Sequence, residues 1–232
     1  ATGGTFTTSD ETNFHEVTWH PPQVTEETVF EINVTRGDGR GLIGEGHFEI
    51  TVTPDDTPPA PEPLIPTIHS TASGGNWNNA GTWVENRVPT ADDVVEVNGT
   101  VTVYNDETAA GLKVNSGGQL WNRYGNDRSL TVNGDIENAG TIRNNSTRYL
   151  MVYVSGNITN TGKWNNYRNY LFGTNPRHIN TPNPLGGTFN INDNFELLSS
   201  PEFNGSINFN GKIITLDAEN SIIVRGNTSF PC

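Results

Sequence analysis

Short segments in the first fifty residues alternate apolar with polar side chains. Residues 14–19 and 29–35 show this alternation, and Phe48, Ile50 and Val52 continue it. A period of two with β-branched and aromatic residues is typical of half-buried antiparallel strands. The glycine-rich stretch RGDGRG (residues 36–41) lies between the last two segments, and it favours a tight turn that joins a β-hairpin.

A different apolar pattern fills the second half of the chain and repeats about every 22 residues. The segments VNGDIENAGTIRN (132–144) and VSGNITNTGKWNN (154–166) align without a gap. The same step backwards gives a weaker copy with Val114 opposite Ile136, and FNGSINFNGKI (203–213) is a fourth copy with Ile207 in that position. Apolar triplets of period two, separated by Gly and Asn, are what one coil of a parallel β-helix requires.

The repeat also predicts which side chains face the interior of this β-helix. Inward residues stack on those of the next coil, so Leu120, Ile142 and Trp164 should line the interior. The polar residues expected to stack at one corner, with their amides hydrogen-bonded along the stack, are Asn122, Asn144 and Asn166. We expect about six coils over residues 92–230 and a right-handed helix.

A proline-rich segment, PDDTPPAPEPLIP (54–66), separates the two patterns. Proline locks φ and donates no backbone hydrogen bond, so this segment is expected to be an extended, semi-rigid linker. The sequence therefore predicts an all-β chain in three parts. These are a partial immunoglobulin-like β-sandwich over residues 1–53, a proline-rich linker over 54–68, and a parallel β-helix with an N-terminal cap over 69–232.

Residues 3–53 resemble the second half of PKD-like and related immunoglobulin-like domains of secreted proteins. The resemblance rests on the stretch VTWHPPQVTEETVFEINVTRGDG and the closing FEITVT. It implies a β-sandwich, but the opening strands of that family are missing, and a few strands leave one sheet face uncovered. Either the sequence begins within the domain, or another chain supplies the missing strands.

Residues 69–109 resemble the opening of glycine-rich secreted β-helix domains and, more weakly, of G8-type extracellular domains. The stretch SGGNWNNAGTWVENRVPTADDVVEVNGTVTV carries this resemblance. It implies that the segment leads into the first coil. Because a coil stack exposes its terminal coil, we expect Trp77 and Trp83 to cover that apolar end.

Composition narrows the functional classes. The chain has 26 acidic and 13 basic side chains, a net charge of −13, which disfavours nucleic acid as a partner because phosphates require clustered Lys and Arg. No apolar run approaches the roughly 20 residues of a membrane-spanning helix. The single cysteine, Cys232, excludes a disulfide within the chain.

The sequence contains no recognisable catalytic or metal-binding motif. Its five histidines share no metal-ligand spacing, and we expect neither a metal nor another cofactor. The adjacent Asp92 and Asp93 admit a catalytic interpretation, but their turn-like context favours hydrogen bonds to corner backbone N–H groups. Asp135 and Glu137 lie on one face of a strand and suit a Ca²⁺ or sugar contact, although a solvated face is the simpler interpretation. We therefore predict that the chain is not an enzyme.

Charge is unevenly distributed along the chain. Residues 1–109 carry a net charge of −15, whereas residues 110–180 carry +5. Within the positive block, the repeat brings basic and aromatic residues to one side of successive coils. These candidate contact residues are Trp121, Arg123, Tyr124, Arg128, Arg148, Tyr149, Tyr167, Arg168 and Tyr170. They form either an ordinary solvated corner or a patch for an acidic partner, which could be an anionic glycan or the acidic N-terminal region of another copy.

These observations leave two functional hypotheses. The first is an extracellular or cell-surface structural and adhesive protein, a stalk or filament subunit that associates head to tail with its own copies. The second is a carbohydrate-binding or polysaccharide-cleaving β-helix module, in which sugars stack on exposed aromatic rings. The alignment places Trp164 inward and Trp121 outward, so Trp121 is the better sugar-stacking candidate.

Overall fold

The structure is a computed structural model that divides into two units, Ala1–Pro59 and Ala60–Cys232. The residues that it describes are 5–8, 17–20, 28–37, 43–52, 61–145, 148–216, 220–226 and 228–229. Within them the chain is nearly all β and contains no α-helix; a 3₁₀ turn, η1, spans Ala80–Thr82. Cys232, the turn at residues 38–42 and residues 54–60 of the predicted linker lie outside the described residues.

The N-terminal unit contains two antiparallel strand pairs. Strand β1 (Thr5–Thr8) pairs with β2 (Val17–His20), and β3 (Thr28–Gly37) pairs with β4 (Ile43–Val52) over their full length. This confirms the antiparallel strands and the hairpin between β3 and β4. The described strands form two separate two-stranded sheets, so the immunoglobulin-like sandwich stays a prediction.

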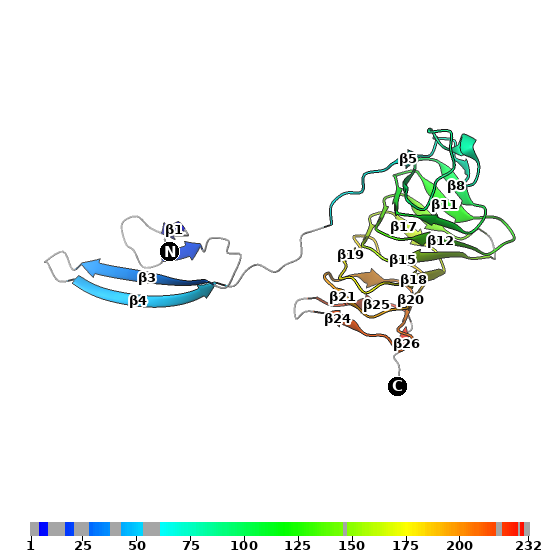
Figure 1. The fold of residues 1–232 in the computed structure, drawn as a ribbon. Coiled ribbons are helices and arrows are strands. Elements are labelled where there is room, and N and C mark those ends of the chain that lie inside the picture. The colour runs from blue at the N-terminus through cyan, green and yellow to red at the C-terminus, as the bar shows by residue number, and fades with distance from the viewer. Residues whose placement is uncertain are drawn as a thin grey trace. The chain divides into compact units, whose positions relative to one another are not determined.

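The C-terminal unit is a parallel β-solenoid of about six turns with about 21 residues per turn, and its coils follow one another from β5 to β26 (Figure 1). Three sheets, here called I, II and III, run along it. Sheet I contains β5 (Ile68–His69), β7 (Val94–Val97), β10 (Gly111–Val114), β13 (Ile136–Asn138), β16 (Ile158–Asn160) and β19 (Ile179–Asn180). Sheet II contains β6 (Gly75–Asn76), β8 (Thr100–Val103), β11 (Gln119–Asn122), β14 (Thr141–Arg143) and β17 (Lys163–Asn165).

Sheet III is the longest and carries the candidate site described below. It contains β9 (Glu107–Ala109), β12 (Arg128–Val132), β15 (Leu150–Val154), β18 (Arg168–Leu171), β20 (Thr188–Ile191), β23 (Ser206–Asn208) and β26 (Thr228–Ser229). Two short parallel pairs complete the C-terminal coils. They are β21 (Phe195–Leu197) with β24 (Ile214–Leu216), and β22 (Glu202–Phe203) with β25 (Ile223–Val224).

The strand register confirms the 22-residue repeat for its two best copies. Val132 pairs with Val154, and Ile136 pairs with Ile158, in parallel. The predicted register of the preceding coil is wrong in sheet I, where Ile136 pairs with Leu112 instead of Val114. In that coil the turn between sheets I and II spans residues 115–118. In the next coil the corresponding turn is shorter and spans only residues 139–140. Strands must stay in register, but corners can differ in length, so the period shifts.

The fourth predicted copy lies in a different sheet from the other three. Ile207 pairs with Phe189 in sheet III, not with the strands of sheet I, and Ile213 is mostly exposed. All three sheets alternate inward apolar and outward polar residues, so the alternation alone does not identify the sheet.

The predicted interior is confirmed. Leu120, Ile142 and Trp164 are fully buried and belong to one continuous core. Trp77 and Trp83 are also buried in that core, with ring centroids 5.4 Å apart in an edge-to-face arrangement. Because the chain at Trp77 continues β6, the first strand of sheet II, the two indoles fill the first coil as predicted.

The asparagine corner forms, but its hydrogen bonds differ from the prediction. Asn122, Asn144 and Asn166 are buried. Asn122 Oδ1 accepts the backbone N–H of Asn145 on the next coil, and Asn144 Oδ1 accepts that of Leu150. These amides therefore satisfy backbone groups at the corner. A bond between amides of successive coils is found in sheet I, where Asn138 donates to Asn160 at 2.7 Å.

Candidate functional site

The outward face of sheet III presents two columns of side chains. The first column aligns Met151, Arg168 and Thr188 on β15, β18 and β20. The second aligns Tyr153, Tyr170 and Asn190 on the same three strands. Successive side chains of a strand point to opposite faces, so the residues between the columns, such as Asn169 and Phe189, are buried in the interior.

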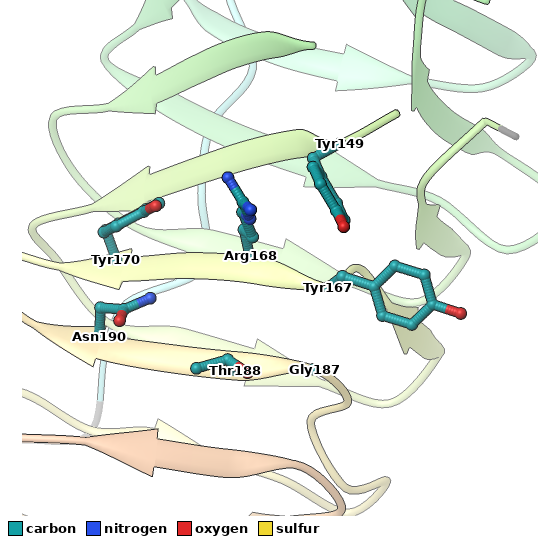
Figure 2. Close-up of a pocket in the computed structure, with 7 residues that line it drawn as sticks. All are labelled: Tyr149, Tyr167, Arg168, Tyr170, Gly187, Thr188 and Asn190. Atoms are coloured by element: carbon teal, nitrogen blue, oxygen red, sulfur yellow. The ribbon is translucent and has the colours of Figure 1, made fainter. Parts of the chain in front are cut away.

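A shallow groove of about 570 Å³ lies on this face. Its lining residues are Tyr149, Tyr167, Arg168, Tyr170, Gly187, Thr188 and Asn190. Figure 2 shows Arg168 rising from β18 between Tyr170 and Tyr149, with Thr188 and Asn190 on the adjacent strand. The groove is therefore built by side chains of consecutive coils that the strand register aligns.

Two pairs of tyrosines flank the groove. The Tyr153 and Tyr170 rings are stacked, with centroids 4.4 Å apart and planes 8° apart, while Tyr149 and Tyr167 meet edge to face at 6.3 Å. Burial and the adjacent Tyr170 raise the pKa of Tyr153, so the Tyr153 hydroxyl stays protonated at neutral pH. Tyr167 is 61% exposed. Its ring therefore offers apolar surface to a ligand.

Arg168 places a positive charge at the centre of the groove. Its guanidinium carbon lies 4.0 Å from the centroid of the Tyr149 ring, which holds the planar group by a cation–π contact. Among the residues that the structure describes, no carboxylate lies within ion-pair distance of Arg168 and no acceptor takes a hydrogen bond from it. Its N–H donors are therefore open to a ligand.

The floor of the groove depends on a glycine and on a buried amide. Gly187 has φ +86°, and a Cβ built on it would approach the carbonyl oxygen of Asn166 to 1.9 Å; only glycine fits there. Beneath it, Asn169 accepts hydrogen bonds from Trp164 Nε1 at 3.0 Å and from Asn166 Nδ2 at 2.9 Å. Its own amide donates to the carbonyl of Gly186. These hydrogen bonds join the backbone segments that carry Tyr167 and Gly187.

Four of the nine predicted contact residues, Tyr149, Tyr167, Arg168 and Tyr170, line the groove. Arg148 is exposed next to Tyr149. The others lie outside it on earlier coils: Arg123 stacks on the Tyr104 ring at 4.1 Å, and Arg128 donates to the Tyr104 carbonyl. Tyr124 is 73% exposed.

Trp121 faces outward as predicted, but neighbouring side chains already contact its indole. Its Nε1 donates to Thr102 Oγ1, and the Arg143 guanidinium lies 4.0 Å from its ring.

Sequence reasoning missed Tyr153, Gly187, Thr188 and Asn190. The 22-residue period, applied to Tyr170, leads to Asn192, whereas the partner in the structure is Asn190. The coil is shorter at this point. The alternation of residues 188–191, with Phe189 and Ile191 facing inward, was the available signal.

The candidate catalytic carboxylates have structural partners. Asp93 accepts a bidentate ion pair from Arg87, with both contacts at 2.6 Å, and a hydrogen bond from the N–H of Thr90 at 2.7 Å. The Arg87 hydrogen bonds, followed by those of Thr90 and Thr67, hold the pKa of Asp93 well below its usual range despite burial. This confirms the corner interpretation for Asp93, while Asp92 is exposed.

The carboxylates of Asp135 and Glu137 also have hydrogen-bond partners within the solenoid. Asp135 accepts the N–H of Asn157 at 2.7 Å. Glu137 accepts the N–H of Leu64 and forms an ion pair with Lys113 at 3.3 Å. The sugar or calcium contact proposed for the pair therefore competes with hydrogen bonds that join neighbouring segments of the solenoid.

The described residues contain no group of three His, Cys, Asp or Glu side chains close enough to hold a metal ion. They also contain no helix of the length and apolarity needed to cross a membrane.

No family model matches the chain, and neither the curated proteins nor the solved structures contain a match. Its function must therefore be argued from the groove itself.

Proposed function

We propose that this chain is an adhesive protein of the cell surface or extracellular space, and that its solenoid binds a glycan in the groove of sheet III. The observation that carries the proposal is the combination, in one groove, of three tyrosine rings with the unpaired guanidinium of Arg168. The resemblance of residues 69–109 to secreted β-helix domains supports the location.

The chemistry of the groove suits a sugar. The C–H face of a sugar ring is apolar and packs on an aromatic face, while its hydroxyls need donors and acceptors nearby. Tyr170 and Tyr167 supply the rings. Thr188 and Asn190, on the adjacent coil, supply polar groups within the same groove.

The groove also favours binding over cleavage. Glycosidases generally use two carboxyl groups that flank the scissile bond. None of the seven lining residues is acidic, and Asp93 and Asp135 accept hydrogen bonds from neighbouring segments of the solenoid. We therefore keep the prediction that the chain is not an enzyme. A shallow, open groove gives modest affinity, which an adhesive protein increases by binding several sites at once.

Binding of the purified chain to immobilised polysaccharides tests this proposal. We expect Tyr170→Ala and Tyr167→Ala each to weaken binding about tenfold. The matched control is Tyr124→Ala, because Tyr124 is even more exposed than Tyr167 but lies outside the groove. Equal losses for Tyr124→Ala, or no binding to any polysaccharide, would contradict the proposal. The appearance of new reducing ends during incubation would contradict its non-catalytic part.

Self-association remains the competing use of the same surface. The acidic N-terminal region, net −15 over residues 1–109, could dock on the basic face of another copy. Light scattering distinguishes the two, since an electrostatic contact between copies should dissociate as salt is raised.

A further inference from the structure

The outward face of sheet III is free of acidic residues although the chain as a whole is acidic. Its outward side chains, from β9 to β23, are Ser129, Met151, Arg168, Thr188 and Ser206 in one column and Thr108, Thr131, Tyr153, Tyr170, Asn190 and Asn208 in the other. The chain has twice as many acidic as basic residues, 26 against 13. The only charged group in these columns is therefore the guanidinium of Arg168.

The carboxylates at the corners that directly precede β9 and β12 are both engaged. Asp106 Oδ1 accepts the N–H of Ser129 at 2.8 Å, and Asp127 Oδ1 accepts that of Tyr149 at 2.9 Å. Neither lies within ion-pair distance of Arg168. Their backbone hydrogen bonds hold them at the corners, so the positive charge in the groove is not neutralised by a direct partner.

The position of Arg168 relative to the rings fixes how a ligand would lie. Tyr170 stacks on Tyr153 of the preceding coil at 4.4 Å, so its other face is turned toward Asn190 on the following coil. A sugar ring on that free face lies beside Arg168, which belongs to the neighbouring column (Figure 2). Thr188, the register partner of Arg168, is one strand spacing away, about 4.8 Å, and its hydroxyl can donate to the same ligand group.

We infer that the sugar bound in this groove is acidic, and that its anionic group is held by the Arg168 guanidinium and the Thr188 hydroxyl while its ring packs on Tyr170. This inference rests on the proposed function and narrows its ligand. A guanidinium that is prevented from rotating by stacking presents two parallel N–H donors, which match a carboxylate and also accept a sulfate. The shared chemistry is a single oxyanion on a sugar ring.

Titration calorimetry on the whole chain can test this with three probes. They are an oligogalacturonate, the same oligomer after reduction of its carboxyl groups, and a sulfated galactan oligomer. We expect the reduced, neutral oligomer to bind at least tenfold more weakly than the oligogalacturonate. Comparison of the two charged probes shows whether carboxylate or sulfate is preferred. Equal affinity for the neutral and charged oligomers would overturn the inference.

Substitutions of Arg168 test whether this residue causes the preference for a charged oligomer. Arg168→Gln should weaken binding of the charged oligomer at least tenfold and leave binding of the neutral oligomer unchanged, and Arg168→Lys should restore only part of the loss. The matched control is Arg143→Gln, because Arg143 stacks on Trp121 at the same 4.0 Å but on sheet II. Thermal unfolding of each variant verifies that it is folded. Unchanged binding of the charged oligomer by Arg168→Gln would overturn the inference.

The remaining outcomes separate the inference from the proposed function. If neutral and charged oligomers bind equally and Tyr170→Ala abolishes binding of both, the proposed function stands and the inference fails. Absence of any saccharide binding, together with salt-sensitive association of the chain with itself, would overturn both and assign the groove to the acidic region of a second copy.

Discussion

Sheets I and III are both built from short parallel strands, but their outward side chains differ. Those of sheet I include charged and paired residues, whereas those of sheet III are mainly aromatic or uncharged. On sheet I the outward column aligns His69, Glu96, Lys113 and Glu137. Lys113 forms an ion pair with Glu137 at 3.3 Å, and the ring of His69 lies 3.8 Å from the Glu96 carboxylate. On sheet III one outward column holds the stacked tyrosines, and the other holds Arg168, which has no acidic partner among the described residues.

This difference indicates that the outward residues of a solenoid, and not the inward ones, determine what it binds. The inward residues decide whether the coils stack, and they are mainly apolar in both sheets. The outward residues contribute little to folding, because exposed ion pairs are worth only about 0–1 kcal/mol. A face that leaves a cation and aromatic rings unpaired gives up that small gain and retains groups that can bind a ligand. Four further predictions test this contrast.

The largest effect should come from the interior and should be similar under both sheets. Phe189→Ala under sheet III is expected to cost about 3–5 kcal/mol, and Ile158→Ala under sheet I about 2–5 kcal/mol, because both side chains are fully buried. Denaturant unfolding measures both. A loss below about 1 kcal/mol at either position would show that the two sheets do not share one packed core.

The groove floor should be the next most sensitive position. Gly187→Ala must both adopt φ +86° and displace the Asn166 carbonyl, so we expect a loss of about 2–4 kcal/mol. Gly125→Ala is the matched control, since Gly125 has φ +76° but nothing within 4 Å of an added Cβ; it should lose only about 1–2 kcal/mol. Equal losses would mean that the close approach at Gly187 does not matter.

Acid should weaken the solenoid at the beginning of sheet I. The pKa of Asp93 is held low by Arg87, Thr90 and Thr67, so its stabilisation is present above the unfolded-state pKa of about 4 and is lost as pH falls below it. Asp93→Asn should cost about 1–2 kcal/mol at pH 7. It should also flatten the decline in unfolding free energy between pH 5 and pH 2. An unchanged pH dependence would contradict this account.

The smallest effect should come from the paired face of sheet I. Lys113→Met removes an ion pair with a half-buried Glu137, and we expect a change of about 0.5 kcal/mol or less. Glycan binding in the groove should not change. A loss of binding would show that the charge of sheet I acts on sheet III over a distance.

The interior of the solenoid could be predicted because it depends on a pattern that the sequence displays. Leu120, Ile142 and Trp164 keep the same spacing and are all buried. The sheet of Ile207 could not be predicted, because inward apolar residues alternate alike in all three sheets. Corner length, which sets the register, leaves no regular signal in the chain.

The candidate site was predictable only in part, for the same reason. Tyr149, Tyr167, Arg168 and Tyr170 share a composition that marks a basic, aromatic patch. The groove needs the register, however: the repeat sets Tyr153 opposite Asn175, whereas the structure stacks it on Tyr170. The burial of Asn169 was also hidden, since an asparagine is buried only when its amide is hydrogen-bonded, as this one is.

A crystal structure of the whole chain soaked with an oligogalacturonate tests the central claim most directly. The account predicts a sugar ring on the free face of Tyr170, with its carboxylate within hydrogen-bond distance of the Arg168 guanidinium and the Thr188 hydroxyl. An oligomer bound elsewhere, for example on Trp121 of sheet II, with the groove of sheet III unoccupied, would contradict it.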